Sequence, residues 1–490
     1  MKRRVTVLTL LLVLLFMPFI GALVVAPLQR RMADVTAVIM AGAVMLAAIS
    51  AIIWAGGGCF DYSLAGLPWL AVPVPLFGIQ IDPLSSLMLI AITVVGFLIV
   101  LYSAGYMSEL NKEHPTQAEK GRYYFFTLLF VGAMTGLVLS RNFFEIFLFW
   151  ELTTLCSWGL ISHKRSAIAV QAGFKAMVIT AGAGLFFLAA LLIMYAKTGS
   201  FEFSALGQLP PGLRLTAVIF LLIGAWGKSA QLPFSSWLPT AMEAPTPASA
   251  YLHAAAMVKA GVYLTARIII SSQAVPAQAG YLMGGLAVAT MFFALILYFF
   301  QDDLKRLLAF STIAHLGYMF LGLSLGVAGS PLALQGGLLH LINHAFTKTL
   351  LFLAVGAISC ATGTRSMKAL SGLGRKMPVT TAAFIVGALS ISGVPPFNIF
   401  WSKFFIIAGA IQLNSAWGWT LGLLAIVESL AGFAWFLIVI HRVFFGQTSP
   451  AASEAVDPPP VMLIPLLVLM VLSLLSPVFG LAIITRIMGG

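Results

Sequence analysis

The sequence predicts an all-α polytopic membrane protein with about fourteen transmembrane helices. Of its 490 residues, 60% are hydrophobic and only 9% are charged, whereas an ordinary globular domain carries roughly 25% charged residues. The apolar runs are continuous for roughly 20 residues, the length of helix that crosses a bilayer. Strands of a membrane barrel would instead alternate apolar and polar residues. Because backbone groups in lipid must be hydrogen-bonded internally, we expect these runs to be helices.

Apolar runs separated by charged, proline or glycine clusters delimit the helices in order. They are expected at 5–26, 36–56, 83–104, 122–140, 143–162, 173–196, 215–232, 249–272, 279–300, 306–328, 333–358, 380–411, 418–446 and 461–487. The first run resembles a signal peptide, but it is longer than usual and lacks a convincing cleavage site, so we interpret it as a span. The three cysteines (Cys59, Cys156 and Cys360) are isolated, which argues against an iron–sulfur site or a disulfide framework.

The basic residues near the helix ends predict an orientation, because cytoplasmic loops are enriched in lysine and arginine. Of the 27 Lys and Arg residues, fifteen lie in or beside connections that follow odd-numbered helices, and eight lie on the other side. We therefore expect the first set to face the cytoplasm and both termini to lie on the non-cytoplasmic side. The basic cluster at residues 2–4 opposes this orientation locally.

The remaining four basic residues fall inside predicted spans, where charge is costly. They are Lys228, Lys259, Lys348 and Lys403. A lysine at the bilayer centre costs roughly 2.5–3.5 kcal/mol on insertion scales, and such residues usually face a polar interior and mark an ion pathway. The alternative is that each side chain extends along its helix to the membrane surface.

Proline and glycine interrupt two of the spans that carry these lysines. Lys228 lies in AWGKSAQLPFSSWLPTAMEAPTPASA, in the seventh predicted helix, and Lys403 lies in LSISGVPPFNIFWSKFF, in the twelfth. A broken helix at membrane depth frees backbone carbonyls and lets water or ions approach. Paired broken helices in corresponding positions are typical of transporters built from inverted repeats. For Lys228 the alternative is a proline-rich loop at a helix end.

The eleventh predicted helix carries a column of titratable groups. His340, His344 and Lys348 are spaced by four residues, so they lie on one helical face. Histidine changes charge near neutral pH, which suits it to passing protons. A buried histidine bonded to a backbone carbonyl is the alternative for any one of them.

Further polar residues extend this set. Glu151 is a carboxylate within the fifth helix and is expected to pair with Lys228. His253 lies six residues before Lys259 on the eighth helix, so the two do not share a helical face. His315 and Glu428 are weaker candidates on helices ten and thirteen, and we expect Asp302, Asp303 and Lys305 to be loop residues.

Several motifs resemble one known family. They are FWE at 149–151, WGKSAQLPFSSWLPTAMEAPTPASAYLHAAAMVKAG at 226–261, DLKRLLAFSTIAHLGYM at 303–319, HAFTK at 344–348 and SGVPPFNIFWSK at 392–403. The chain resembles, from about residue 70 to 446, the antiporter-like subunits shared by respiratory complex I, multisubunit cation/proton antiporters and membrane-bound group 4 NiFe hydrogenases. The phrases RYYFF, AWGKSAQLP, MEAPTP and ESLAGFAWF are most similar to the D component of hydrogenase-4.

The resemblance implies a particular organisation of the chain. It implies N-terminal helices in 1–121, two inverted five-helix repeats in 122–272 and 279–446 with discontinuous helices seven and twelve, and a last helix in 461–490. Seven positions match the family's polar residues, and three more candidates come from the residue pattern alone; the seven are Glu151, Lys228, Lys259, His340, His344, Lys348 and Lys403. Those expected in the proton relay are Glu151, Lys228, His253, Lys259, His340, His344, Lys348 and Lys403, with His315 and Glu428 less certain. Two positions depart from the family pattern, because Ile399 stands where glycine is usual and Thr347 where phenylalanine is frequent.

The resemblance also implies a function. The chain is expected to be a non-catalytic, proton-translocating subunit of a group 4 NiFe hydrogenase of the formate hydrogenlyase type, in the bacterial inner membrane. Protons would pass from Lys228 by Lys259, His344 and Lys348 to Lys403. No cofactor is expected in this subunit, and the NiFe centre and iron–sulfur clusters would lie in partner subunits beside further antiporter-like subunits. The alternatives are a subunit of a multisubunit cation (Na⁺)/proton antiporter or of complex I, a structural anchor, and a solute transporter.

Overall fold

A computed structural model describes residues 2–63, 77–115 and 119–489, and it is almost entirely helical. The helices are α1 (Lys2–Val25), α2 (Arg30–Ala55), α3 (Pro83–Tyr106), α4 (Lys120–Leu139), α5 (Phe143–Ile161), α6 (Ala167–Thr198), α7 (Pro211–Lys228), α8 (Trp237–Thr240), α9 (Thr246–Ala254), α10 (Met257–Arg267), α11 (Ala277–Tyr298), α12 (Leu304–Val327), α13 (Pro331–Thr362), α14 (Pro378–Ser392), α15 (Asn398–Gln412), α16 (Ala416–Phe444) and α17 (Pro460–Met488). Short 3₁₀ or π turns lie at Phe203–Gln208, Ala241–Glu243, Ile268–Ser272, Leu373–Arg375 and Pro450–Ala452. One antiparallel hairpin joins β1 (Phe60–Ser63) to β2 (Gly78–Ile81).

The helices confirm the predicted polytopic membrane fold. Thirteen helical stretches of the described residues are long and apolar enough to cross a membrane, and α9 with α10 counts as one of them. The shorter apolar helix α14, followed by α15, covers the predicted twelfth span. The predicted order of spans is therefore confirmed. The boundaries of the four predicted domains remain a prediction.

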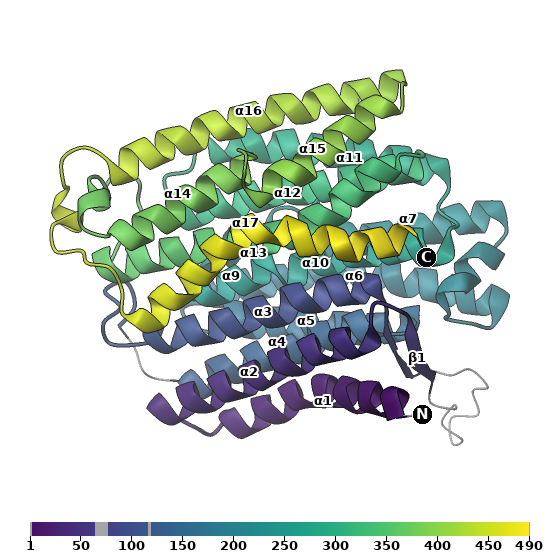
Figure 1. The fold of residues 1–490 in the computed structure, drawn as a ribbon, viewed down its shortest axis with the longest axis horizontal. Coiled ribbons are helices and arrows are strands. Elements are labelled where there is room, and N and C mark those ends of the chain that lie inside the picture. Colours follow the sequence, from purple (N-terminus) through teal and green to yellow (C-terminus); the bar gives the residue numbers. More distant parts are fainter. Residues whose placement is uncertain (1, 64–76, 116–118, 490) are drawn as a thin grey trace.

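The long helices lie side by side, with α1 and α2 at one edge of the bundle and α16 at the other (Figure 1). Helix α13 packs against α3, α9, α12, α14, α15 and α17, so it is the centre of the bundle. Helices α12 and α13 are almost fully buried, whereas the outer helices expose leucine, valine and phenylalanine side chains. In a membrane such outer faces contact lipid, so the column on α13 lies as far from lipid as the fold allows.

Both ends of the described chain lie at the same end of the bundle (Figure 1), as an even number of spans requires. The connections that follow odd-numbered spans meet at the opposite end. Lys112, after the third span, lies 3.7 Å from Glu454, after the thirteenth, and Arg365, after the eleventh, lies 3.2 Å from Glu113. The structure thus groups the loops as the basic residues predicted. The compartment that each end faces remains a prediction.

Local sequence signals explain where many helices begin and end. Asp82 caps α3 in a reciprocal arrangement with Ser85, and Asn142 and Asp303 accept hydrogen bonds from the first turns of α5 and α12. Gly393 ends α14 with φ of 86°, a left-handed conformation that glycine adopts without steric cost. The Pro395-Pro396 pair follows and separates α14 from α15, which confirms the predicted break in the twelfth span.

Two predicted spans differ from the structure. The predicted helix at 215–232 ends at Lys228, because the proline-rich segment that follows cannot continue it. The predicted helix at 249–272 is interrupted at Ala255 and Ala256, between His253 and Lys259. There the amide of Ala256 bonds to the carbonyl of Tyr251 at 3.1 Å, five residues back. Alanine favours helices, so no local signal predicted this interruption.

Candidate ion-translocation site

The predicted lysines and histidines lie on six different helices and are buried. Lys228 ends α7, His253 lies on α9, Lys259 on α10, His315 on α12, Lys403 on α15, and His340, His344 and Lys348 on α13. Each of these side chains is at most 5% exposed. The folded chain therefore brings most of the predicted set into its interior. Their hydrogen bonds and ring contacts show which of these side chains lie next to one another.

Lys228 contacts α5 at the point where α7 ends. Its Nζ atom donates to the backbone carbonyl of Trp150 and to the hydroxyl of Thr153, and it lies 4.7 Å from the centre of the Trp150 ring. These partners hold an ammonium group by hydrogen bonds and by the negative face of an aromatic ring. No hydrogen bond or ion pair of the described residues joins Lys228 to Glu151 directly, although the two groups interact electrostatically.

The reason is the direction of Glu151 on α5. Trp150 and Thr153 contact Lys228. Glu151 lies on an adjoining face of α5 and packs against Gly184 of α6. The Oε1 atom of Glu151 is buried without a hydrogen-bond partner among the described residues. Sequence position alone could not distinguish these two faces, because it does not show which face of α5 packs against α7.

The central contact of the site joins two helices from different parts of the chain. The Nζ atom of Lys259 on α10 lies 3.0 Å from Nδ1 of His344 on α13. A proton moves readily between nitrogen atoms at this distance, since it is an ordinary hydrogen-bond length. The other ring nitrogen of His344, Nε2, has no hydrogen-bond partner in the part of the chain that the structure describes.

Three histidines form a stacked cluster beside this contact. Nδ1 of His315 lies 3.0 Å from Nε2 of His340, and the two rings stack with their centres 5.2 Å apart. The ring of His315 also lies 5.6 Å from that of His344. His315 therefore lies between His344 and His340. This residue, the less certain candidate from the sequence, is central to the cluster.

Lys403 lies at the far side of the histidine cluster. Its Nζ atom donates to the hydroxyl of Ser429 at 3.0 Å and lies 4.7 Å from the centre of the Tyr318 ring. The Tyr318 ring lies 5.6 Å from that of His340, so it connects the cluster to Lys403. We call the series Lys259, His344, His315, His340, Tyr318 and Lys403 the central row.

Lys348 forms no hydrogen bond with His344 or Lys403 among the described residues, although it interacts electrostatically with both, so its predicted place in the relay remains a prediction. Its Nζ atom donates to the hydroxyl of Ser311 at 2.9 Å and to the carbonyl of Leu308 at 3.4 Å. Both partners belong to the half of α12 that precedes His315. The Lys348 side chain therefore points away from the central row, toward the start of α12. The i, i+4, i+8 spacing puts Lys348 on the same face of α13 as His340 and His344. That spacing does not determine which side chains Lys348 contacts.

Two other predicted residues lie beside the central row. Glu428 on α16 interacts electrostatically with Lys403, and its Oε2 atom is buried without a hydrogen-bond partner among the described residues. His253 on α9 stacks on Phe352 with ring centres 5.4 Å apart, and neither ring nitrogen has a partner within the described chain. In the described chain no hydrogen bond joins Lys228 to Lys259 either, and their helices meet through Ser229, which donates to the carbonyl of Val258 at 2.7 Å.

The sequence analysis missed several residues that hold the row in place. Tyr318 lies between the histidine cluster and Lys403, and Ser402 lies 2.8 Å from Nδ1 of His340. Thr153, Ser311 and Ser429 contact Lys228, Lys348 and Lys403. Serine, threonine and tyrosine are common in membrane helices, so their residue types carried no signal. Tyr318 does lie within the motif at 303–319.

An amide and hydroxyl network adjoins the break between α14 and α15. Asn343 and Asn398 each donate to the backbone carbonyl of the other, at 2.7 and 3.1 Å. Ser476 of α17 accepts from Asn398 at 2.9 Å and donates to Asn343 at 2.8 Å. Thr347 and Ser390 complete it, each with a contact to Oδ1 of Asn398. We call these five residues the amide network. It ties α15 to α13, α14 and α17.

The described residues contain no group of three or more His, Cys, Asp or Glu side chains arranged to hold a metal ion. The histidines of the central row instead face lysines, serine and tyrosine.

Comparisons with known proteins identify the family. A family model described as "NADH:quinone oxidoreductase/Mrp antiporter, TM" matches residues 140–429, more than half of the chain. The chain belongs to this NADH:quinone oxidoreductase/Mrp antiporter family. A second family model, described as "NADH-Ubiquinone oxidoreductase (complex I), chain 5 N-terminus", matches residues 69–123. The resemblance inferred from the motifs is thus confirmed for the antiporter-like family.

Curated relatives of the antiporter-like family are similar over much of the chain. The A component of the Na(+)/H(+) antiporter of Alkalihalophilus pseudofirmus is 37% identical over 426 residues, which are 80% of this chain and 51% of the relative. The A1 component of the Na(+)/H(+) antiporter of Staphylococcus aureus is 38% identical over 399 residues, 76% of this chain and 49% of the relative. The chain therefore spans about half the length of these relatives.

Solved structures of related membrane complexes have the same fold. The Mrp complex from Dietzia sp. DQ12-45-1b has a chain that matches with a TM-score of 0.86 at 31% identity, over 97% of this chain and 52% of that one. The membrane-bound sulfane sulfur reductase, an archaeal respiratory membrane complex, has a chain that matches with a TM-score of 0.85 at 26% identity. The match covers 97% of this chain and 96% of that one. A chain of each complex therefore shares this architecture.

Proposed function

We propose that this chain is an ion-translocating subunit of a multisubunit cation/proton antiporter in a bacterial cytoplasmic membrane, and that its central row carries protons. The central row is the observation that carries the proposal: titratable side chains, with Tyr318 among them, follow one another from Lys259 to Lys403 across the buried middle of the bundle. The names of the relatives in Alkalihalophilus and Staphylococcus support the cation/proton antiporter class. The termini would lie on the non-cytoplasmic side.

The contacts suggest how a proton would travel along the row. A proton on Lys259 passes to Nδ1 of His344 across 3.0 Å, and rotation of the ring presents it to His315. It then passes to His340 across the 3.0 Å contact of the two rings. Like charges repel strongly in a low-dielectric interior, so a new proton at one end favours release at the other.

Lys228 and Glu151 would control how the row is loaded. The Glu151 carboxylate has an unpartnered oxygen, among the described residues, beside the helix that holds Lys228. A rotation that brought the carboxylate to the ammonium group would favour the charged lysine, and separation would favour release of its proton. Trp150 and Thr153 hold the Lys228 ammonium group by hydrogen bonds, and Glu151 interacts with it electrostatically.

A second candidate is a proton-translocating subunit of a redox-driven complex, such as a group 4 NiFe hydrogenase. The match to the archaeal respiratory complex, over nearly all of both chains, favours it, as do the motifs similar to the D component of hydrogenase-4. In that case the NiFe centre and iron–sulfur clusters would lie in partner subunits, and electron transfer there would drive the same row.

Purification of the tagged complex from detergent-solubilised membranes tests the proposal. Recovery of small membrane antiporter subunits alone, with Na⁺-dependent proton transport after reconstitution, is the expected result. Co-purification of a NiFe hydrogenase and iron–sulfur proteins, with Na⁺-independent transport, would replace it by the second candidate. If Lys259→Met and Lys403→Met complexes assemble and transport protons at the normal rate, the row carries none and both candidates fail.

A further inference from the structure

His340 of the central row has a hydrogen-bond partner at each of its ring nitrogens. Its Nε2 atom lies 3.0 Å from Nδ1 of His315 on α12, and its Nδ1 atom lies 2.8 Å from the hydroxyl oxygen of Ser402 on α15. All three side chains are at most 4% exposed. Turning the ring over would place carbon atoms against both partners. The two contacts together therefore fix which nitrogen of His340 faces which neighbour.

The Ser402 hydroxyl has a second contact, with a backbone carbonyl. Its oxygen lies 3.0 Å from the carbonyl oxygen of Ile399, three residues earlier in the first turn of α15. A hydroxyl has one proton to donate, whereas its oxygen accepts through two lone pairs, and a carbonyl can only accept. When Ser402 donates to Ile399, it must therefore accept the proton on Nδ1 of His340.

Two arrangements of the protons fit the neutral side chains. In the first, Ser402 donates to Ile399 and accepts from Nδ1 of His340. Nδ1 of His315 then donates to Nε2 of His340. In the second, Ser402 donates to Nδ1 of His340, and Nε2 of His340 donates to Nδ1 of His315. The first makes three hydrogen bonds and the second two. Because water does not replace a lost hydrogen bond at buried groups, we expect the first arrangement.

The first arrangement leaves Nε2 of His340 ready to accept a proton from His315. A charged His315 carries a proton on both ring nitrogens, and it gives the Nδ1 proton to Nε2 of His340 across 3.0 Å. His315 becomes neutral, with its remaining proton on Nε2, and His340 becomes charged. The hydrogen bond from Nδ1 of His340 to Ser402 is the same before and after. The transfer therefore needs no movement of Ser402.

The second arrangement blocks the same transfer. Nε2 of His340 then already carries a proton and directs it at Nδ1 of His315. A charged His315 directs its own Nδ1 proton at the same place, so two protons face each other and neither nitrogen can accept. Transfer would have to wait until His340 moved its proton from Nε2 to Nδ1.

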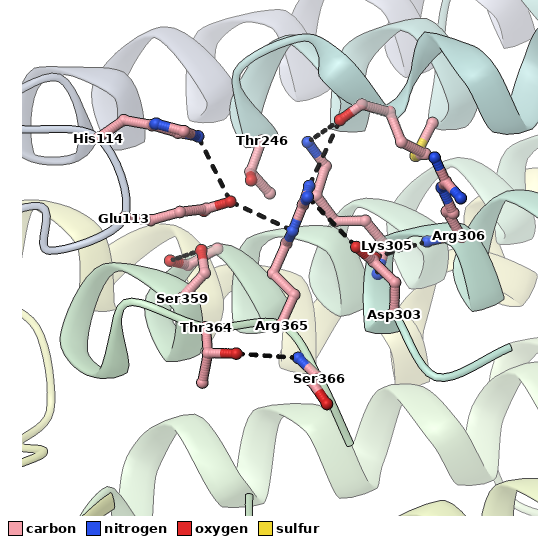
Figure 2. Close-up of polar contacts among 12 residues, drawn as sticks. Glu113, His114, Thr246, Asp303, Lys305, Arg306, Ser359, Thr364, Arg365 and Ser366 are labelled. Atoms are coloured by element: carbon pink, nitrogen blue, oxygen red, sulfur yellow. Dashed lines mark hydrogen bonds and ion pairs between the residues drawn. The ribbon is translucent and has the colours of Figure 1, made fainter. Parts of the chain in front are cut away.

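The helices that carry the two histidines are fixed to each other independently of Ser402. Residues 328–330 join the end of α12 to the start of α13. At their other ends, the amide of Leu304 donates to the carbonyl of Arg365 at 3.0 Å, and Nη2 of Arg365 lies 3.2 Å from Oδ2 of Asp303. Figure 2 shows Arg365 between Asp303 and Glu113, and its Nε atom lies 3.2 Å from Oε1 of Glu113. The start of α12 is thus tied to the segment that follows α13.

Lys305 anchors the same end of α12, and its burial shows that the prediction of a loop residue is wrong. It is the second residue of α12 and only 1% exposed. Its Nζ atom donates to the carbonyls of Met242 and Ala244 at 2.8 and 2.7 Å. Both ends of the α12–α13 pair are therefore held, so removing one hydroxyl group from α15 should leave the two histidine rings where they are.

We propose that Ser402 is a positioning residue that sets the tautomer of His340, so that Nε2 of His340 accepts the proton from His315. The inference rests on the proposed function, since it concerns one step of the central row. Ser402 itself neither gains nor loses a proton in this step. The general reason is that the hydrogen bond made by one ring nitrogen of a histidine decides the state of the other.

The test compares Ser402→Ala with Ser473→Ala in the complete complex, with proton transport measured after reconstitution in vesicles. Both serines are fully buried, but the Ser473 hydroxyl donates to the carbonyl of Leu469 in its own helix. Ser402→Ala is expected to slow transport about tenfold, the low end for loss of a group that orients a histidine. Ser473→Ala is expected to leave the rate unchanged. Ser402→Thr keeps the hydroxyl group and should restore most of the rate.

NMR of the complex with isotope-labelled histidine rings separates the tautomer from a structural role. The His340 signal is identified as the one that His340→Phe removes. At alkaline pH, where neutral histidine prevails, this signal should be that of a proton on Nδ1. Ser402→Ala should shift it toward a proton on Nε2, and Ser402→Thr should return it. If Ser402→Ala slows transport but leaves the His340 signal unchanged, Ser402 has only a structural role and the proposal is overturned.

The remaining outcomes separate this inference from the proposed function. If Lys259→Met abolishes transport but Ser402→Ala matches Ser473→Ala, the central row stands and the role of Ser402 is wrong. If an assembled Lys259→Met complex transports normally, the proposed function fails. Should Ser402→Ala prevent assembly, Ser402→Cys replaces the hydroxyl by a weaker acceptor at the same place. It should then slow transport and shift the His340 signal, and an unchanged signal would overturn the proposal.

Discussion

The Nζ atom of Lys259 and Nδ1 of His344 lie 3.0 Å apart although 85 residues separate them in the chain. The contact joins α10, from the predicted first repeat, to α13, from the second. Any proton that crosses between the two parts of the bundle along the central row must use it. It is therefore the first place to test the row.

Replacing Lys259 with methionine should abolish transport while the protein still folds. Methionine fills a similar volume and leaves no charge in a site that is fully buried. We expect a loss of at least about a hundredfold in proton transport by the reconstituted complex. Lys259→Arg keeps the charge but releases its proton far less readily, so it should be almost as inactive. Activity near normal in the arginine variant would show that charge alone suffices.

Replacing His315 should be as damaging as replacing His340, although the sequence ranked His315 lower. His315 lies between His344 and His340, so His315→Phe keeps an aromatic ring in the stack and removes both proton-carrying nitrogens. We expect transport to fall about a hundredfold with normal assembly. Thr312→Val, on the same helix, is the control, because the Thr312 hydroxyl donates to the carbonyl of Leu308 in its own helix. If His315→Phe retains most of the activity, protons bypass this residue.

Replacing Asn398 with alanine should destabilise the protein without removing a titratable group. Its side chain bonds to the Asn343 carbonyl, Ser476, Thr347 and Ser390. Each buried polar group left unpaired costs about 1–3 kcal/mol. We expect a clear drop in the melting temperature of the detergent-solubilised protein. Ser473→Ala, on α17, should change it little, because Ser473 bonds only to the carbonyl of Leu469 in its own helix. Equal effects would mean that the amide network adds nothing.

The buried ion pair of Asp82 and Arg267 should make stability fall in acid. Burial alone would raise the pKa of Asp82, but Arg267 and the hydrogen bonds from Ser85 outweigh it and lower that pKa below its usual value. A carboxylate with a lowered pKa stabilises the folded state above about pH 4, its unfolded value, and the stabilisation disappears as pH falls through the lower folded value. Melting temperatures between pH 7 and pH 3 measure this.

Asp82→Asn tests the same pair at neutral pH. It leaves Arg267 buried without its anion, which costs about 3–5 kcal/mol. The matched control is Asp61→Asn, because Asp61 pairs with Arg141 at 3.0 Å but is 48% exposed, and an exposed pair contributes about 0–1 kcal/mol. Similar losses in the two variants would show that the burial of Arg267 does not matter.

The sequence predicted the helices well because the length of an apolar run is a property of local sequence. It predicted the breaks beside Lys228 and before Lys403 for the same reason, since proline and glycine act locally. The interruption at Ala255 and Ala256 was missed because two alanines favour a continuous helix. Packing against neighbouring helices must therefore stabilise the interruption between α9 and α10, and such packing cannot be predicted from the types of the residues at the interruption.

The sequence indicated which titratable residues are buried, but not which of them contact one another. His340 and His344 were found because their spacing places them on one face of one helix. The positions of His315 and Lys348 depend on how α12 packs against α13, which spacing within either helix does not determine. Glu151 interacts electrostatically with Lys228 but does not contact it directly, since one residue along α5 turns a side chain by about 100°.

The amide network has a further consequence for the conduction of protons. Its side chains are amides and hydroxyls, which neither gain nor lose a proton near neutral pH, and every donor described above already has an acceptor. It lies directly alongside His340 and His344 on α13 and yet offers a migrating charge nowhere to stop. It would therefore fill a break in the membrane with polar groups that carry no charge of their own, so that a proton on the central row is more stable on the histidines and lysines than on any group toward α17.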